Sequence, residues 1–192
     1  MSSSLEKIIE LVQSYERLGK KLYKNGAVAY GNAPHIGKKA YLHLVMPAAT
    51  EKQISKIEQA INMTLHQSFR SLLSEHNGID LFSGTLSIFG FKDWDKSADS
   101  QPFDIITPNT YERPAWLKSG SLEFAFYNFD GSKAVLSPAG QVTVHDAEKG
   151  KILNKWSSLD HFLASEAARL PSFFDDSGKL VDEDVCTVPI KD

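Results

Sequence analysis

Hydrophobic residues follow helical spacing and then strand spacing across residues 46–91, and the rest of the chain is organised around this stretch. Its first apolar residues recur three and four positions apart, which places them on one helical face: Ile54, Ile57 and Ile61. Thr50 and Gln53 have the spacing of a capping box, which marks the start of a helix. We therefore predict a helix that begins at Thr50 and ends at Asn62, a residue that tolerates left-handed backbone.

A second helical stripe and a short strand follow within the same stretch. The stripe consists of Leu65, Phe69, Leu72 and Leu73. Thr64 and Gln67 repeat the capping spacing, and Asn77 with Gly78 should end the helix, because glycine adopts left-handed backbone without a Cβ clash. The β-forming residues at 86–89, bounded by glycines, predict a strand.

The N-terminal part of the chain begins with another amphipathic pattern. Ser3 and Glu6 form a capping box, so a helix should begin there and continue to Gly26. Its apolar stripe consists of Leu5, Ile8, Ile9, Val12, Tyr15, Leu18 and Leu22. We expect this stripe to pack on the sheet or on other helices, and the alternative is a partner-binding helix. Residues 40–45 predict a strand.

Strand spacing dominates the second half of the chain. Its apolar segments cover residues 122–129, 134–137, 141–146 and 152–156. Turn residues such as Asp-Gly separate the segments, which predicts an antiparallel meander. Ser157 and Asp160 should begin a final helix that ends at Pro171. The order of elements predicts an α+β fold, with helices packed against an antiparallel sheet.

Length and charge are those of an ordinary globular domain. A chain of 192 residues buries roughly 70% of the surface of its unfolded form, so we expect a single domain over residues 1–192. Residues 1–45 should form a helical extension of a core at 46–165, and 171–192 an acidic tail. The net charge of −3 is unlike that of general nucleic-acid binders, which concentrate Lys and Arg on one face.

Cysteine usage and hydropathy bear on the compartment. The single Cys186 cannot form an internal disulfide, which fits a reducing environment. Residues 1–10 lack the basic and apolar segments of a signal peptide. No stretch approaches the roughly 20 apolar residues that span a bilayer. We therefore expect a cytoplasmic protein that binds neither membranes nor nucleic acid.

Candidate metal and cofactor sites fail on their spacing. The six histidines include no i, i+4 pair with a catalytic glutamate. Residues 93–104 approach a calcium-loop template, but Ala98 replaces its glycine and Asp104 replaces its longer glutamate. Residues 31–39 differ from a phosphate-binding loop in spacing and at Lys39. We expect no metal and no cofactor.

Catalytic patterns are equally weak. No G-x-S-x-G elbow is present, and Cys186 lies among carboxylates, which disfavour a reactive thiolate. A pair of catalytic carboxylates depends on their separation in space, which the sequence leaves open. We therefore expect no enzyme.

Residues 46–91 resemble the opening of the SUKH superfamily, which includes fungal cell-wall assembly regulators and many bacterial immunity proteins. The runs P-A-A-T-E-x-x-I-x-x-x-E, S-F-R-x-L-L-x-E-H-N-G and T-L-S-I-F-G carry the likeness. The matching positions are Ile54, Glu58, Leu65, Phe69, Leu72, Leu73, Asn77, Gly78, Leu86 and Gly90. Asn62 and His66 depart from the pattern, which usually has Gly and Pro there. The resemblance resumes after residue 121 and covers residues 46–165.

The resemblance implies a non-catalytic domain that binds a protein, and the leading hypothesis is an immunity protein that neutralises a bacterial toxin. The alternatives are a regulatory scaffold of the cell-wall assembly and glucan synthesis type, and an uncharacterised hydrolase, which would need a pocket with perturbed carboxylates. For binding we single out the polar loop at residues 92–104, where an exposed tryptophan among acids would suit a basic toxin: Asp93, Trp94, Asp95 and Asp99. The alternative for Trp94 is that it packs under its loop.

Overall fold

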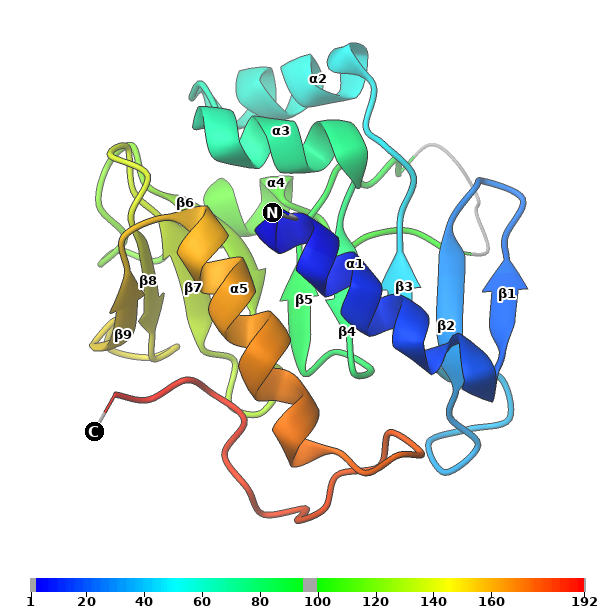
Figure 1. Ribbon diagram of the computed structural model, residues 1–192. Coiled ribbons are helices and arrows are strands. Elements are labelled where there is room, and N and C mark those ends of the chain that lie inside the picture. The colour runs from blue at the N-terminus through cyan, green and yellow to red at the C-terminus, as the bar shows by residue number, and fades with distance from the viewer. Residues whose placement is uncertain (1–2, 95–99, 192) are drawn as a thin grey trace.

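A computed structural model describes residues 3–94 and 100–191 (Figure 1). Within these residues nine strands form one antiparallel sheet, in which each strand pairs with the next along the chain. The strands are β1 Lys20–Leu22, β2 Val28–Asn32, β3 Tyr41–Val45, β4 Ile79–Leu81, β5 Leu86–Ile88, β6 Leu122–Phe126, β7 Lys133–Leu136, β8 Val142–His145 and β9 Ile152–Trp156. The predicted α+β fold and the C-terminal meander are confirmed.

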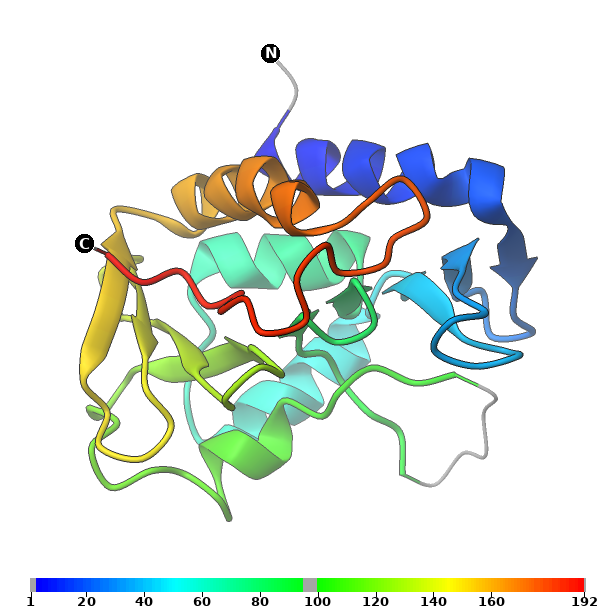
Figure 2. The same cartoon turned by 90° about the horizontal axis from the view of Figure 1, so that it is seen from below.

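The helices lie on two sides of the molecule. Those in the described residues are α1 Ser4–Ser14, α2 Glu51–Ile61, α3 Gln67–Glu75, α4 Ile106–Asn109 and α5 Leu159–Arg169. The long helices α1 and α5 lie side by side, whereas α2 and α4 lie on the opposite side (Figure 2). Short 3-10 helices follow α1 and α5, at Tyr15–Leu18 and Leu170–Phe173. No helix of the described residues is both long and apolar enough to cross a membrane.

The helix α2 forms as its local signals predict. The Gln53 N–H donates to Thr50 Oγ1 at 3.3 Å, and the Thr50 N–H donates to Gln53 Oε1 at 2.8 Å. Asn62 adopts left-handed backbone with φ of 50° and ends the helix. Ile54 and Ile57 are fully buried on the predicted face. Both caps and the apolar stripe of this helix are therefore confirmed.

The first helix ends earlier than predicted. α1 stops at Ser14, a 3-10 turn follows, and Gly19 adopts a φ of 123° that redirects the chain into β1. Leu22 lies on this edge strand and is 72% exposed, so the helix expected to reach Gly26 is wrong beyond Ser14. Helical spacing at Leu18 and Leu22 is misleading because Gly19 separates the two residues into different elements. The strand predicted at residues 40–45 is confirmed as β3.

Two predicted helix caps are also wrong by one or two positions. The cap of α3 is His66, whose Nδ1 accepts from the Ser68 N–H at 3.2 Å, and not Thr64. The cap of α5 is Ser158, whose Oγ accepts from the His161 N–H at 3.1 Å, and not Ser157. In each case a later residue with a free acceptor reaches the first turn.

One hydrophobic core joins the helices to the sheet. Phe124 on β6 lies between Phe69 of α3 and Phe162 of α5, with ring centroids 5.7 and 5.5 Å away. On the far side of the core, Phe174 stacks on Phe82 at 4.0 Å. This stacking fixes the beginning of the acidic C-terminal segment.

Candidate functional site

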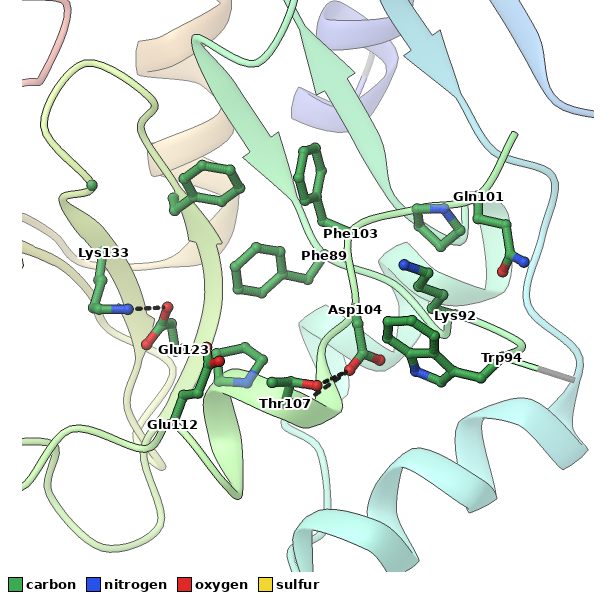
Figure 3. Close-up of a pocket in the computed structure, with 14 residues that line it drawn as sticks. Phe89, Lys92, Trp94, Gln101, Phe103, Asp104, Thr107, Glu112, Glu123 and Lys133 are labelled. Carbon is green, nitrogen blue, oxygen red and sulfur yellow. Dashed lines mark hydrogen bonds and ion pairs between the residues drawn. The ribbon is translucent and has the colours of Figure 1, made fainter. Parts of the chain in front are cut away.

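A pocket of about 540 Å³ opens where residues 92–94 and 101–104 meet α4, β6 and β7 (Figure 3). Four aromatic residues contribute to its wall: Phe89, Trp94, Phe103 and Phe126. Its charged lining residues are Lys92, Asp104, Glu112, Glu123 and Lys133. The pocket thus combines a broad apolar wall with charges of both signs.

A β-bulge in β6 brings two of these residues into the same pocket. Strict alternation would place Glu123 and Phe126 on opposite faces of the strand, because successive side chains point to opposite sides. The pairing of β6 with β7 shifts register between Glu123 and Ala125, so one extra residue enters the strand there. Phe124 consequently packs into the core, while Glu123 and Phe126 both line the pocket.

Glu123 is the most deeply buried charged residue of the pocket, with only 1% of its surface exposed. Burial raises the pKa of its carboxyl group, the hydrogen bond from Lys133 opposes this shift, and the negative charge of Glu112 adds to it. Lys133 Nζ lies 2.8 Å from Glu123 Oε1. Oε2 of the same carboxylate is buried and accepts no hydrogen bond from the described residues.

Asp104 is likewise held through one of its two carboxylate oxygens. Its Oδ2 accepts from the Thr107 N–H at 2.9 Å and from the Thr107 hydroxyl at 2.6 Å. These bonds fix Asp104 against the first turn of α4. Its other oxygen, Oδ1, is buried and has no hydrogen-bond partner within the described residues. Each of the two carboxylates therefore has one oxygen bound by the protein and one that has no donor in the described part of the chain.

Side-chain amides hold the segment that carries this pocket. In three places among the described residues, one amide bonds both the N–H and the C=O of a single residue. Asn77 does so with Phe91, at 2.7 and 2.9 Å. Gln101 does so with Asp93, at 2.9 and 3.0 Å.

The third such amide is Asn109 of α4, which bonds Glu123 of β6. Its Nδ2 donates to the Glu123 carbonyl at 2.7 Å, and its Oδ1 accepts from the Glu123 N–H at 2.9 Å. We refer to these three arrangements as the amide clamps. The first ties Phe91 to Asn77, which precedes β4, the second ties the two described ends of the loop to each other, and the third ties α4 to β6.

Gly90 allows the loop to return alongside β5. Its N–H donates to the Phe103 carbonyl at 2.9 Å, and its carbonyl accepts from the Ile105 N–H at 3.0 Å. A Cβ at this position would lie 2.2 Å from the Asn77 carbonyl oxygen. Only glycine therefore permits this close approach, which sets Asp104 at the edge of the pocket.

The residues singled out for binding have different positions. Trp94 lines the pocket and is 68% exposed, so the alternative that it packs under its loop is wrong. Lys92 Nζ lies 3.7 Å from the centroid of the Trp94 ring. Asp93 is half-buried and lines a smaller adjacent pocket. Asp95 and Asp99 lie outside the described residues.

Sequence reasoning missed Asp104 and Glu123 as partners in one pocket. The sequence places Asp104 only in an incomplete calcium-loop template, and Glu123 only in a predicted strand. In the described residues no group of three or more His, Cys, Asp or Glu side chains is placed to hold a metal ion. The arrangement instead provides a rigid recess that has aromatic walls and buried hydrogen-bond acceptors.

Comparison with known proteins is informative at the level of the family. A search of curated proteins found no match. Residues 48–165, more than half of the chain, match the SMI1 / KNR4 family (SUKH-1). The matched region contains α2 to α4, β4 to β9 and every residue that lines the pocket. The chain therefore belongs to the SMI1 / KNR4 family (SUKH-1), as its motifs predict.

Proposed function

We propose that this chain is a non-catalytic protein-binding domain that neutralises a bacterial toxin by direct contact through the pocket face. The exposed tryptophan carries this proposal. Trp94 is 68% exposed at the rim of a recess, and the adjoining Phe103 is 47% exposed. Large aromatic residues beside a pocket are typical of the few positions that dominate the binding energy of an interface.

The hydrogen bonds that hold the backbone around these aromatic residues favour tight binding. The amide clamps at Phe91 and Asp93 hold the described ends of the loop, and the clamp at Glu123 holds α4 against β6, before any partner arrives. Binding to a preformed surface loses less conformational entropy than binding to a mobile one.

Co-expression tests the proposal. The chain would be produced together with the C-terminal domain of a toxin encoded by the adjacent gene. We expect survival of cells that make the intact chain, and reduced survival with Trp94→Ala. Val181→Ala is the matched control, because Val181 is 73% exposed but lies in the C-terminal segment beside Phe173. Equal killing with and without the intact chain would rule out the immunity role.

A regulatory scaffold of the cell-wall assembly type is the alternative within the same family resemblance. Such a scaffold would also bind a protein, and it would do so without protecting cells from a toxin. Survival in the co-expression experiment therefore separates the two roles.

A hydrolase is the second candidate, and Glu123 is the observation that favours it. A general acid needs a carboxyl group with a raised pKa, and burial raises the pKa of Glu123 within the pocket. Lys133, however, binds this carboxylate at 2.8 Å and stabilises its charged form. A hydrolase would lose all activity in Glu123→Gln, whereas a binding domain would still form its complex through Trp94.

A further inference from the structure

We propose that the outer edge of β1 binds an extended acidic segment of a partner protein, which continues the sheet as an additional antiparallel strand. β1 and β9 are the two ends of the strand order, and they lie at opposite sides of the sheet in Figure 1. β1 also precedes residues 48–165, which match the family. The inference therefore concerns a surface separate from the pocket face and does not depend on the proposed function.

The direction of the main-chain groups along β1 is the first argument. Gly19 and Tyr23 flank this strand, and each forms a main-chain hydrogen bond with the opposite arm of the β1–β2 hairpin, at 2.8 and 2.9 Å. Main-chain groups of an antiparallel strand alternate in direction, so those of Lys20 and Leu22 point away from β2. Within the described residues β1 pairs with β2 alone, and all three of its residues are exposed. Such an edge is a template for a further strand.

The charge of this edge is the second argument, and it selects an acidic partner. Residues 16–24 carry one acidic side chain, Glu16, and four basic ones, Arg17, Lys20, Lys21 and Lys24, although the whole chain has a net charge of −3. Lys20 Nζ lies 3.1 Å from Glu16, and Arg17 binds the C-terminal segment. Lys21 and Lys24 are exposed and form no ion pair with any described residue. Acidic side chains of a bound strand would balance these two charges.

The alternation of side chains along β1 predicts the pattern of the bound segment. Lys21 Nζ lies 4.2 Å from the centroid of the Tyr23 ring, so these two side chains share one face of the strand. Lys20 and Leu22 share the other face, where Leu22 is 72% exposed. Side chains directly opposite each other in an antiparallel pair are in contact. The segment therefore needs an apolar residue opposite Leu22, followed by two acidic residues opposite Lys21 and Lys20.

The same lysines disfavour a second copy of this strand as the occupant. Antiparallel pairing of two β1 strands centred on Lys21 would place this residue opposite its own copy, and like charges in that position are destabilising. Lysine on an edge strand prevents such self-pairing. At the other end of the sheet, the Lys191 N–H of the C-terminal segment donates to the Leu153 carbonyl of β9 at 3.0 Å. The chain thus covers part of the β9 edge itself, whereas β1 carries charges that suit an acidic strand.

A capped peptide, acetyl-Thr-Val-Glu-Glu-Val-Thr-amide, is the probe for this inference. We would titrate it into the labelled full-length chain and follow backbone amides by NMR. We expect saturable shifts at residues 20–22 and slower hydrogen exchange of the Lys20 and Leu22 amides, because the bound strand would accept hydrogen bonds from them. Exchange of the Lys21 amide, which points toward β2, should change little.

Two modified peptides separate strand pairing from attraction by charge alone. A peptide with both glutamates replaced by lysine keeps the strand-forming residues and reverses the charge, so it should not bind. N-methylation of the first valine and the second glutamate keeps the charge and removes the two N–H groups that would face β1. This peptide should bind at least about tenfold more weakly, because it lacks two main-chain hydrogen bonds.

A pair of charge-reversal variants locates the surface. Lys21→Glu should weaken binding of the acidic peptide by about tenfold or more, because it sets like charges opposite each other. Lys52→Glu makes the same change at an exposed position of α2 and should bind like the unmodified chain. Lys21 is exposed, so its variant should fold, and the peptide controls use the unmodified chain in any case.

Four results would overturn the inference: no saturable shift at residues 20–22, unchanged hydrogen exchange at Lys20 and Leu22, equal binding of either modified peptide, or an equal loss in Lys52→Glu. Equal binding of the N-methylated peptide would show that the basic edge attracts any polyanion, with no strand formed. Trp94→Ala should bind the peptide as the unmodified chain does. The edge and the toxin-binding face can therefore fail separately.

Discussion

Asn109 and Glu123 are joined by two hydrogen bonds, so that a side-chain amide of α4 occupies the place of a neighbouring strand beside β6. The bonds measure 2.7 Å to the Glu123 carbonyl and 2.9 Å from its N–H. The same Nδ2 also donates to the Ile105 carbonyl at 2.9 Å. Through this contact α4, which fixes Asp104, is tied to the strand that carries Glu123. The spacing of the two pocket carboxylates therefore depends on Asn109.

Asn109→Ala should destabilise the protein, because it leaves two buried carbonyls and one buried N–H without their partner. We expect a loss of about 2–4 kcal/mol in the free energy of unfolding, measured by urea denaturation. Asn128→Ala is the control, since Asn128 is exposed beyond the end of β6. A loss below about 0.5 kcal/mol, as for an ordinary surface change, would show that the clamp contributes little.

Gly90→Ala should disrupt the return of the loop. The new Cβ would lie 2.2 Å from the Asn77 carbonyl oxygen, so the backbone must move. We expect the unfolding temperature to fall and the amide signals of residues 103–105 to shift. Gly37→Ala is the matched control, because a Cβ at Gly37 would meet only the Ala40 side chain at 3.9 Å. Equal unfolding temperatures for the two variants would contradict the close approach at Gly90.

Local signals explain how much of the fold the sequence predicts. The capping box at Thr50, the left-handed Asn62 and the turns of the meander each depend on a few neighbouring residues, and each is found as expected. The strand β1 was missed because Leu18 and Leu22 keep helical spacing across Gly19. Local patterns cannot reveal that a single glycine ends the periodicity there.

The pocket depends on contacts that local patterns do not contain. The sequence indicates Trp94 because it is a large aromatic residue in a polar loop. Glu123 was not, because a bulge overrides the alternation of β6 and the amide clamp from Asn109 comes from another element. The sequence marks Asn77 only as a helix stop, whereas in the fold its side chain also bonds Phe91, fourteen residues away. Tertiary contacts of this kind become visible only in the folded chain.

Two buried groups should give opposite pH dependences of stability. Burial lowers the pKa of His43 from 6.5 to about 3, so its contribution is complete above pH 6.5 and is lost as the pH falls. Burial raises the pKa of Asp80 from 3.8 to about 6, so its contribution is complete below pH 3.8 and is lost as the pH rises. Each group changes the free energy of unfolding by at most about 1.4 kcal/mol per pH unit. The two opposite changes therefore largely cancel between pH 4 and 6.

Asp80→Asn should reveal this cancellation. The variant keeps an acceptor for the Ser87 hydroxyl, which lies 2.6 Å from Asp80 Oδ1, and it removes the buried charge. We expect it to be more stable than the unmodified chain at pH 7, by about 1–3 kcal/mol, and equally stable near pH 3.5. Denaturant unfolding across this range would measure the difference. A gain in the free energy of unfolding that does not change with pH would contradict the raised pKa of Asp80.

Lys133→Ala should leave Glu123 without its cationic partner. Breaking such a buried pair costs about 3–5 kcal/mol when a charge remains, so stability at pH 7 should fall strongly. The pKa of Glu123 should rise further, and the loss should therefore become smaller as the pH falls and the carboxyl group is protonated. Lys155→Ala, on the outer strand β9, is the control. A loss that is the same at pH 7 and pH 4.5 would contradict the role of this pair.

The affinity of the adjacent toxin domain for the chain tests the central claim most directly, because the claim is that the pocket face binds a protein through Trp94. Isothermal titration would compare the unmodified chain with Trp94→Ala and Val181→Ala. The account predicts that Trp94→Ala weakens binding by about 30-fold, or about 2 kcal/mol, while Val181→Ala binds as tightly as the unmodified chain. Unchanged affinity in Trp94→Ala would contradict it.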